Sequence, residues 1–138
     1  VNIVPEKCQV DIDVRVPLGG HPEGVEELVR TMLRENFEYQ IVNRISPSYT
    51  PASDSLIKIL QRHGRRVLGY KPPAICMTAT SDAHRFRISL GIPTVTFGPG
   101  YIDMAHAYDE FVDVSDLLKA AKVYANAAID YLNLRKSA

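Results

Sequence analysis

Apolar and polar residues alternate strictly near the start of the chain. From Cys8 to Val16 every second residue is apolar, and the residues between them are polar or charged. Because successive side chains of a strand point to opposite faces, this alternation predicts a half-buried β-strand. The segment Phe37–Ile41 alternates in the same way. Between the two, Pro22 opens a stretch with one apolar stripe, which predicts a helix and hence a β-α-β arrangement for residues 1–45; the stripe consists of Val25, Leu28, Val29, Met32 and Leu33.

After residue 53 the pattern changes to helices that alternate with short apolar runs. We expect helices from Ser53 to a stop at Gly64, from Ser81 or Asp82 to Leu90, and from near Asp113 or Ser115 to about residue 132, with short strands over 74–78 and 94–97. This alternation is typical of an α/β layer. The loop 46–53 contains two prolines and separates the two patterns, so we expect one structural part over 1–46 and another over 53–138.

Composition narrows the class of protein. The chain has 138 residues, of which 46% are apolar and 23% are charged, as in an ordinary globular domain. Its 16 Lys and Arg balance 16 Asp and Glu, which argues against a nucleic-acid partner or a polybasic membrane binder. No apolar run approaches the ~20 residues of a membrane-spanning helix.

The cysteines and the first residues of the chain add two further expectations. Cys8 and Cys76 lie in apolar stretches, which favours buried free thiols in a reducing cytoplasm. The chain opens at Val1 without Met and reaches a predicted strand within a few residues, as expected of a cut inside a larger protein.

The candidate metal ligand is His106. It follows the Gly98-Pro99-Gly100 break and precedes Asp109-Glu110, and an imidazole oriented by a nearby carboxylate is typical of a metal-binding histidine. One histidine near acids is more often a surface residue, and zinc needs three or four protein ligands. The remaining histidines point less to chemistry, since His63 precedes Gly64 and is expected to end a helix.

Three other segments each allow two interpretations. Arg15 shares a polar strand face with two aspartates, and either forms solvated ion pairs or holds a substrate carboxylate by a bidentate fork. Ser81-Asp82 is either a helix cap or a ligand-facing turn, and the Gly-Pro-Gly segment is either a tight turn or a close backbone approach to a substrate. Because the carboxyl ends of parallel strands share one sheet edge, we expect His106 to lie near Asp82 and this loop.

Five segments, taken in order, resemble a known family. They are Asn2-Ile3-Val4-Pro5, the strand that ends Asp13-Val14-Arg15, Thr80-Ser81-Asp82-Ala83, Gly98-Pro99-Gly100 and His106-Ala107-Tyr108-Asp109-Glu110. Together they are similar to the dinuclear zinc amidohydrolases, which include acetylornithine deacetylase, succinyl-diaminopimelate desuccinylase, aminoacylase and the glutamate carboxypeptidase-like enzymes.

The resemblance implies a fold and an activity. Residues 1–46 would be the second half of a β-α-β-β-α-β lid domain that forms a homodimer, and residues 53–138 would close the α/β catalytic domain. The parent enzyme would use two zinc ions, or cobalt or manganese, to cleave an amide bond in an N-acyl amino acid or small peptide.

The resemblance also assigns roles to residues. His106 falls on a zinc ligand, and Asn2 and Arg15 fall on substrate-contacting positions. Walls of the substrate site would come from Thr80, Ser81, Gly98, Pro99 and Gly100.

The departures from the family pattern limit what this chain can do. It contains no His-x-Asp and no Glu-Glu followed by Gly, so we expect no catalytic base in it and no activity from it alone. His84 is inserted before Arg85, which leaves the role of Arg85 open. The alternative is a non-catalytic dimerisation or ligand-binding module derived from the same fold.

Overall fold

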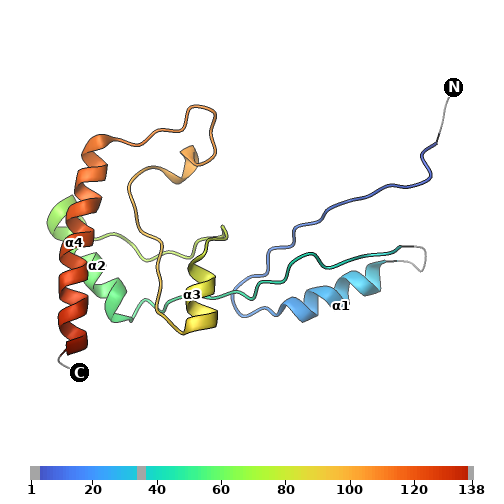
Figure 1. Ribbon diagram of the computed structural model, residues 1–138, viewed down its shortest axis with the longest axis horizontal. Helices are drawn as coiled ribbons and strands as arrows, with labels where there is room; N and C mark the ends of the chain where they lie inside the picture. Colours follow the sequence, from blue (N-terminus) through green and yellow to red (C-terminus); the bar gives the residue numbers. More distant parts are fainter. Residues whose placement is uncertain (1–3, 34–36, 137–138) are drawn as a thin grey trace. The chain divides into compact units, whose positions relative to one another are not determined.

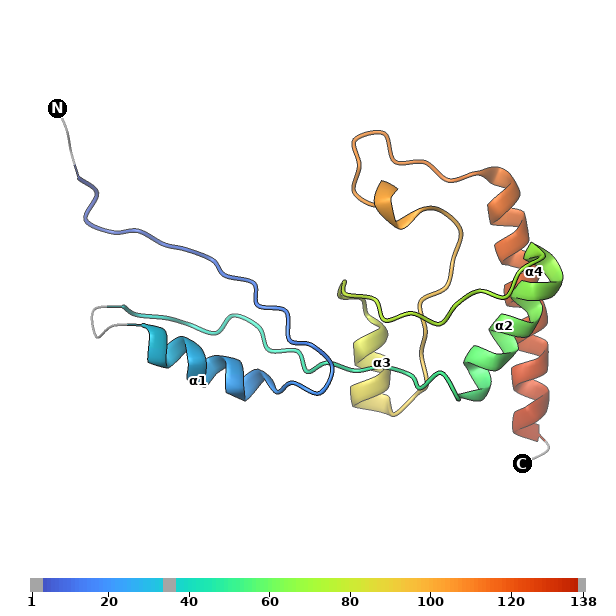
Figure 2. The ribbon, with the colours of Figure 1, turned by 180° about the vertical axis from the view of Figure 1, so that it is seen from behind.

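The computed structural model describes residues 4–33 and 37–136, with side chains up to residue 133. Its helices are α1 (Pro22–Met32), α2 (Ser55–Leu68), α3 (Ala83–Leu90) and α4 (Val114–Lys136), with a short 3-10 helix η1 (Ile102–Met104) before α4 (Figures 1 and 2). The chain divides into two compact units, Val1–Pro47 and Ser48–Ala138. The division falls inside the loop 46–53 that the prolines mark.

In the first unit, α1 starts at Pro22 as its sequence predicts and ends at Met32, while the predicted stop at Asn36 lies outside the described residues. Pro22 occupies the first helical position, and Leu33 follows the last turn with its backbone N–H donated to the Val29 carbonyl at 2.9 Å. Glu26 binds two arginines, Arg30 one turn along the helix and Arg44 in the returning segment. None of the described residues of this unit is buried, so these residues form no apolar core, and exposed ion pairs contribute little stability in its place.

The predicted strands are not confirmed. The described residues contain no β-strand, and the segments 8–16, 37–41, 74–78 and 94–97 run outside regular structure, as the thin tubes of Figures 1 and 2 show. Alternation decides which face a side chain takes, but a strand also needs a neighbour about 4.8 Å away whose backbone groups accept and donate its hydrogen bonds. Without that neighbour the apolar face stays open, and Ile12 is 76% exposed.

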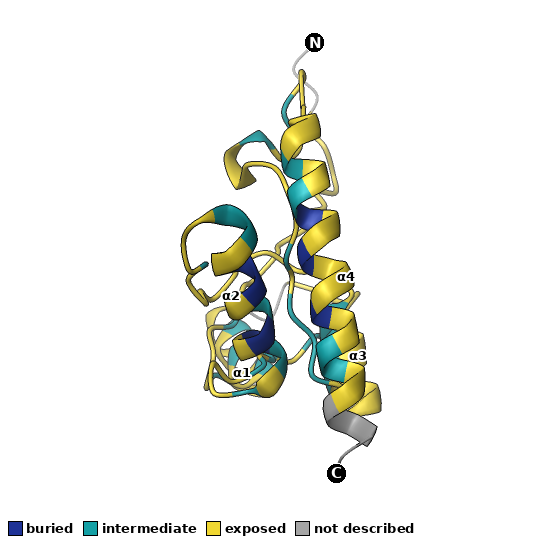
Figure 3. Ribbon diagram, turned by 90° about the vertical axis from the view of Figure 1, so that its left-hand side faces the viewer, coloured by how far each residue is buried: buried dark blue, intermediate teal, exposed yellow. Residues whose placement is uncertain are grey.

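The second unit is built on the packing of α2 against α4. Its core consists of Ile57, Ile59, Ala120, Val123 and Ala127, which are the buried apolar residues of the described chain. The three from α4 are spaced three and four apart, so they form one stripe, and Figure 3 shows the buried positions along the two helices. The alanines let the helices approach closely around Val123, which is fully buried.

The ends of α2 differ from the predicted ones. The N-cap is Asp54, one residue after Ser53, and its carboxylate accepts a hydrogen bond from the Leu56 N–H at 2.8 Å. The helix continues through Gly64 to Gly69, which takes the left-handed conformation at φ 84°. Gly64 is needed for packing, because a Cβ there would lie 2.6 Å from Cγ of Pro72.

The other predicted ends agree more closely with the structure. Asp82 precedes α3 and Gly91 ends it at φ 63°, as the sequence predicts. Helix α4 begins at Val114, between the two predicted starts. Cys8 and Cys76 are free, but both are exposed rather than buried, since the strands that would have covered them are not formed.

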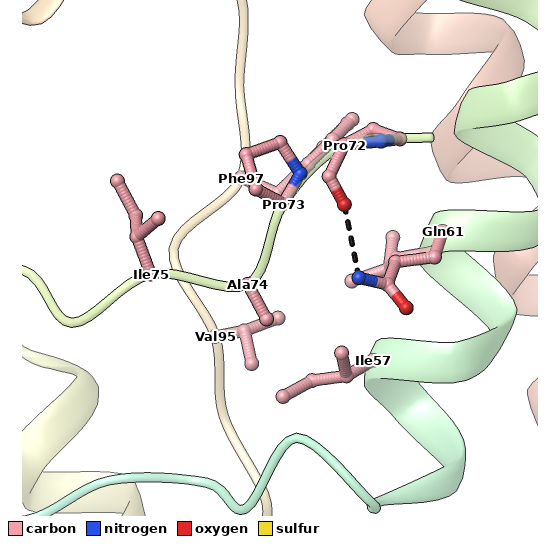
Figure 4. A pocket seen from close by; sticks show the side chains of 9 residues that line it. Ile57, Gln61, Pro72, Pro73, Ala74, Ile75, Val95 and Phe97 are labelled. Atoms are coloured by element: carbon pink, nitrogen blue, oxygen red, sulfur yellow. Dashed lines mark hydrogen bonds between the residues drawn. The ribbon is translucent and has the colours of Figure 1, made fainter. Parts of the chain in front are cut away.

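An apolar cavity lies beside α2. It has a volume of about 90 Å³ and is lined by Ile57 and Leu60 from the helix and by Ile75, Val95 and Phe97 from two of the predicted strands. Figure 4 shows these segments around the cavity, with the Gln61 amide donating to the Pro72 carbonyl at 2.9 Å. The structure thus brings both apolar runs to the same side of α2 although they are not paired.

Polar contacts join α2 to α4 beside this core. The side chain of His63 is 5% exposed, and its Nε2 lies 2.6 Å from Oδ2 of Asp130, which also accepts from Arg62 at 2.5 Å. The hydrogen bond with His63, followed by that with Arg62, holds the pKa of Asp130 below its usual value. His63 therefore does not end the helix, as its sequence position predicted, but ties it to α4. No helix in the part of the chain that the structure describes is long and apolar enough to cross a membrane.

We expect Asp130→Asn to reduce the loss of unfolding free energy that the wild-type chain shows as the pH falls. The folded-state pKa of Asp130 is lowered, so its contribution is complete above the unfolded value of about 3.9 and is lost as the pH falls through the folded value. Urea unfolding followed by circular dichroism from neutral to acid pH measures the slope.

The matched control is Asp116→Asn, because Asp116 binds Lys119 at 2.7 Å within α4. That variant should keep the acid-dependent loss of the wild-type chain. An Asp130→Asn profile as steep as that of the wild type would contradict the role of the pair.

Candidate functional site

His106 lies in the loop between η1 and α4 and is exposed. Its backbone has φ 65°, a left-handed conformation that no other described non-glycine residue adopts. The backbone N–H of His106 donates to Oε2 of Glu110 at 3.1 Å. The carboxylate predicted to orient the imidazole therefore holds the backbone of the loop instead, and leaves the ring open to solvent.

The Gly98-Pro99-Gly100 segment is held by an aromatic residue of α4. The Tyr124 hydroxyl donates to the Phe97 carbonyl, and the two rings meet edge to face with centroids 5.7 Å apart and planes at 82°. A Cβ at Gly98 would lie 3.4 Å from the Tyr124 oxygen, close to ordinary van der Waals contact, and Gly100 has φ 96°. Gly100 therefore has a local reason, because its left-handed conformation forms the turn, and Gly98 lies against the tyrosine.

The Thr80–Asp82 segment opens α3. The Ser81 carbonyl lies 2.7 Å from Nδ1 of His84, and it also accepts from the backbone N–H of His84 at 3.4 Å. Asp82 makes no cap hydrogen bond, but its Oδ1 lies 3.6 Å from Nε of Arg85 in an exposed ion pair. Thr80 is exposed and also interacts with another group of the protein. This arrangement accounts for Arg85 and for the inserted His84 as helix-start contacts.

The two predicted residues of the first unit have different outcomes. Arg15 Nη2 pairs with Oδ2 of Asp13 at 2.6 Å, and both side chains are exposed. This geometry is that of a solvated ion pair. Asn2 lies outside the described residues.

The described residues do not by themselves form a metal centre. Across residues 4–33 and 37–133, no group of three or more His, Cys, Asp or Glu side chains could hold a metal ion. Zinc sites take three or four protein ligands, so His106 can supply at most part of one. The predicted convergence of His106, Asp82 and the Gly98–Gly100 loop stays a prediction.

Comparison with known proteins decides the family. The sequence profile of peptidase family M20/M25/M40 matches residues 3–130. The chain belongs to this family. The predicted resemblance is thereby confirmed, and enzymes of the M20 family are generally metal-dependent.

The curated relatives in this family are hydrolases. The chain is 31% identical over 134 residues to a succinyl-diaminopimelate desuccinylase of Hydrogenovibrio crunogenus, covering 95% of this chain and 35% of that protein. It is 25% identical to a LysW-lysine/LysW-ornithine hydrolase of Sulfurisphaera tokodaii, covering 99% and 38%, and 28% identical to an acetylornithine deacetylase of Myxococcus xanthus, covering 94% and 34%. The chain thus spans about a third of the length of these relatives. No solved structure matches it significantly.

Sequence reasoning missed Tyr124. It stands next to the fully buried Val123 on α4 and is 44% exposed, so helical periodicity alone assigns it no partner. The available signal was the pairing of an aromatic helix residue with Phe97 directly before a Gly-Pro-Gly break, but nothing in the linear spacing of 27 residues joins the two.

We expect Tyr124→Phe to loosen the Gly98–Gly100 loop without dissociating α4. The change removes the hydroxyl that donates to the Phe97 carbonyl and keeps the edge-to-face rings. A single hydrogen bond of about 0.5–1.5 kcal/mol corresponds to hydrogen exchange roughly two- to tenfold faster in this loop.

Hydrogen exchange read by mass spectrometry or NMR measures the effect. The matched control is Tyr108→Phe, whose ring is fully exposed and should leave the loop unchanged. Equal exchange in the Tyr124→Phe and wild-type loops would show that the hydroxyl does not hold the segment.

Proposed function

We propose that this chain is the C-terminal portion of a metal-dependent hydrolase that cleaves an amide bond in N-acyl amino acids or small peptides. The observation that carries the proposal is the M20/M25/M40 match over residues 3–130. Relatives named as a desuccinylase, a deacetylase and a LysW-lysine/LysW-ornithine hydrolase support this class of reaction. The coverage of about a third of each relative supports a partial chain.

The proposed roles follow the two parts of the chain. Residues 1–46 act as half of a lid domain, and residues 53–138 contribute to the catalytic domain. In the latter, His106 serves as one ligand of a zinc, cobalt or manganese centre whose other ligands lie outside this chain. Its exposure, and the Glu110 contact that fixes its backbone, support the assignment.

Substrate contacts are proposed for residues near both ends. Asn2 and Arg15 would bind the substrate from the lid, where the exposed guanidinium of Arg15 can exchange Asp13 for a substrate carboxylate. Walls of the site would come from Thr80, Ser81, Gly98, Pro99 and Gly100. The hydrogen bond from the Tyr124 hydroxyl to the Phe97 carbonyl holds this loop in place, which supports the assignment of Gly98, Pro99 and Gly100.

We expect the chain alone to release no amino acid from N-acetyl or N-succinyl amino acids in the presence of added zinc or cobalt. Its described residues offer one proposed ligand and no complete metal centre, and activation of water needs both a bound metal and a base. Amine release measures turnover, and the cobalt retained after gel filtration measures binding independently of activity.

The variants separate the two parts of this prediction. Any cobalt that the chain does retain should fall in His106→Ala and stay unchanged in the control His21→Ala, whose histidine is also exposed. Turnover that persists in His106→Ala would contradict the proposed function of this histidine. Turnover that His106→Ala abolishes would show that the chain alone holds a working centre, contrary to the prediction.

The coding sequence N-terminal to Val1 distinguishes the hydrolase from the non-catalytic alternative. A His-x-Asp and a Glu-Glu pair there would supply the ligands and base that the family pattern requires. Their absence would favour a dimerisation or ligand-binding module.

We also propose that the first unit forms a homodimer. Its apolar alternating positions are open, since Val10 is 71% and Ile12 76% exposed, and α1 has no buried residue. An unpaired, apolar extended segment is a template for pairing with a second chain.

Ile12→Asp is expected to lower self-association in sedimentation velocity over a series of protein concentrations. A charge on the apolar face opposes its burial against a partner. The matched control is Ile102→Asp in the second unit, where Ile102 is 70% exposed. A wild-type chain that stays monomeric, or an equal effect of both substitutions, would contradict the proposal.

A further inference from the structure

A small polar pocket lies in the second unit, between the loop that leads into α2 and the C-terminal end of α3. It is bordered by Asp54 and Arg87, with Thr50 beside them and with Tyr49, Ile92 and Pro93 forming an apolar wall. None of these residues belongs to the proposed hydrolase site. We propose that this pocket binds a free α-amino acid as a zwitterion, with the carboxylate on Arg87 and the ammonium group on Asp54.

The pocket is held in shape by hydrogen bonds between segments far apart in sequence. Thr50 and Thr94 bind each other twice, since the Thr50 hydroxyl donates to the Thr94 carbonyl at 2.7 Å and accepts from its N–H at 3.0 Å. Arg87 donates from Nη1 to the same carbonyl at 2.7 Å and from Nε to the Ser48 hydroxyl at 3.0 Å. These contacts fix the guanidinium before any ligand arrives, which lowers the entropic cost of binding.

The charge of Arg87 is only partly satisfied. Its guanidinium is half-buried, and both hydrogen-bond acceptors it has among the described residues are neutral oxygens. A guanidinium carries five N–H donors and prefers a carboxylate, which it binds by two parallel hydrogen bonds. The hydrogen bonds to Ser48 and Thr94 use Nε and Nη1, so the N–H groups of Nη2 remain to bind an anion.

Asp54 supplies the opposite charge on the same pocket. One oxygen, Oδ1, caps α2 through the Leu56 N–H, and Oδ2 has no protein partner among the described residues. Asp54 and Arg87 form no ion pair with each other in this part of the chain, although both border the pocket. A cation and an anion held apart across a small cavity match the two charges of an amino acid.

The pocket is small and opens to solvent, which favours a short ligand. Its volume of about 180 Å³ has room for roughly six water molecules at ~30 Å³ each. Pockets for drug-sized ligands span about 300–1,000 Å³, so a peptide or a long N-acyl group would extend beyond this one. The apolar wall of Ile92 and Pro93 suits a short aliphatic side chain.

The test uses three related ligands that differ in which of the two charged groups they carry. The 138-residue chain is titrated with L-alanine, N-acetyl-L-alanine, which lacks the ammonium group, and L-alaninamide, which lacks the carboxylate. The backbone N–H signals of Leu56 and Thr94 report on the pocket by NMR, because each donates to a lining side chain. L-Alanine should shift both signals saturably, with a Kd in the millimolar range, and both analogues should bind at least about tenfold more weakly.

Variants locate the two charges. Asp54→Asn keeps a good N-cap and removes the anion, and Arg87→Gln removes the cation; each should weaken L-alanine binding at least about tenfold. The matched control is Arg66→Gln, an exposed arginine on α2 outside the pocket, which should bind as the wild type does. If Arg87→Gln does not fold, Asp54→Asn and the analogues still decide the question.

Three results would overturn the proposal. They are the absence of a saturable shift with L-alanine, equal affinity for N-acetyl-L-alanine, which would indicate an anion site only, and unchanged binding in Asp54→Asn. The titration needs no metal and no turnover, so its outcome is independent of the proposed hydrolase function.

Discussion

The packing of α2 on α4 is the contact on which the rest of the second unit depends. Val123 is fully buried between the helices, and small residues on either side of it allow the close approach. One turn beyond this apolar stripe, Asp130 adds a polar contact between the two helices, because its carboxylate binds both Arg62 and His63. Without this carboxylate the buried histidine would have no partner in an apolar interface, which costs free energy. The contact therefore favours the alignment of the two helices that brings His63 to Asp130.

Both candidate binding regions of the second unit extend from these helices. Tyr124 follows Val123 on α4 and carries the Gly98–Gly100 loop through Phe97. At the start of α2, Asp54 caps the helix with one carboxylate oxygen and also borders the pocket that it shares with Arg87. Loops that bind ligands need a rigid support, and here one pair of helices provides it at two places.

The first unit has no comparable support. Its helix α1 buries none of its residues, and its extended segments expose their apolar positions. A single helix with two unpaired segments cannot close a core, since about three strands with a covered face are needed for independent stability. Its ion pairs around Glu26 are largely exposed and contribute little to its stability.

The sequence by itself determined the family and where the helices lie, though not all of their ends. Apolar spacing, Pro22 and the left-handed Gly91 act within a few residues, so they can be read from the linear chain. The family followed from five short segments that keep their order. The division into two compact units lies between Pro47 and Ser48, inside the loop 46–53 with its two prolines.

Only the tertiary structure decided what those elements do to one another. Gly64 had the spacing of a helix stop, yet the close approach of Pro72 makes it a packing residue inside α2. His63 looked like a terminal cation and is instead bound to Asp130, 67 residues away. The alternation predicted which face each side chain would take in a strand, but not which segment would pair with it. A ladder of hydrogen bonds forms between two segments, and the sequence of one does not specify its alignment with the other. Tyr124 and Arg87 gained their roles in the same way, through contacts with distant segments that no local pattern encodes.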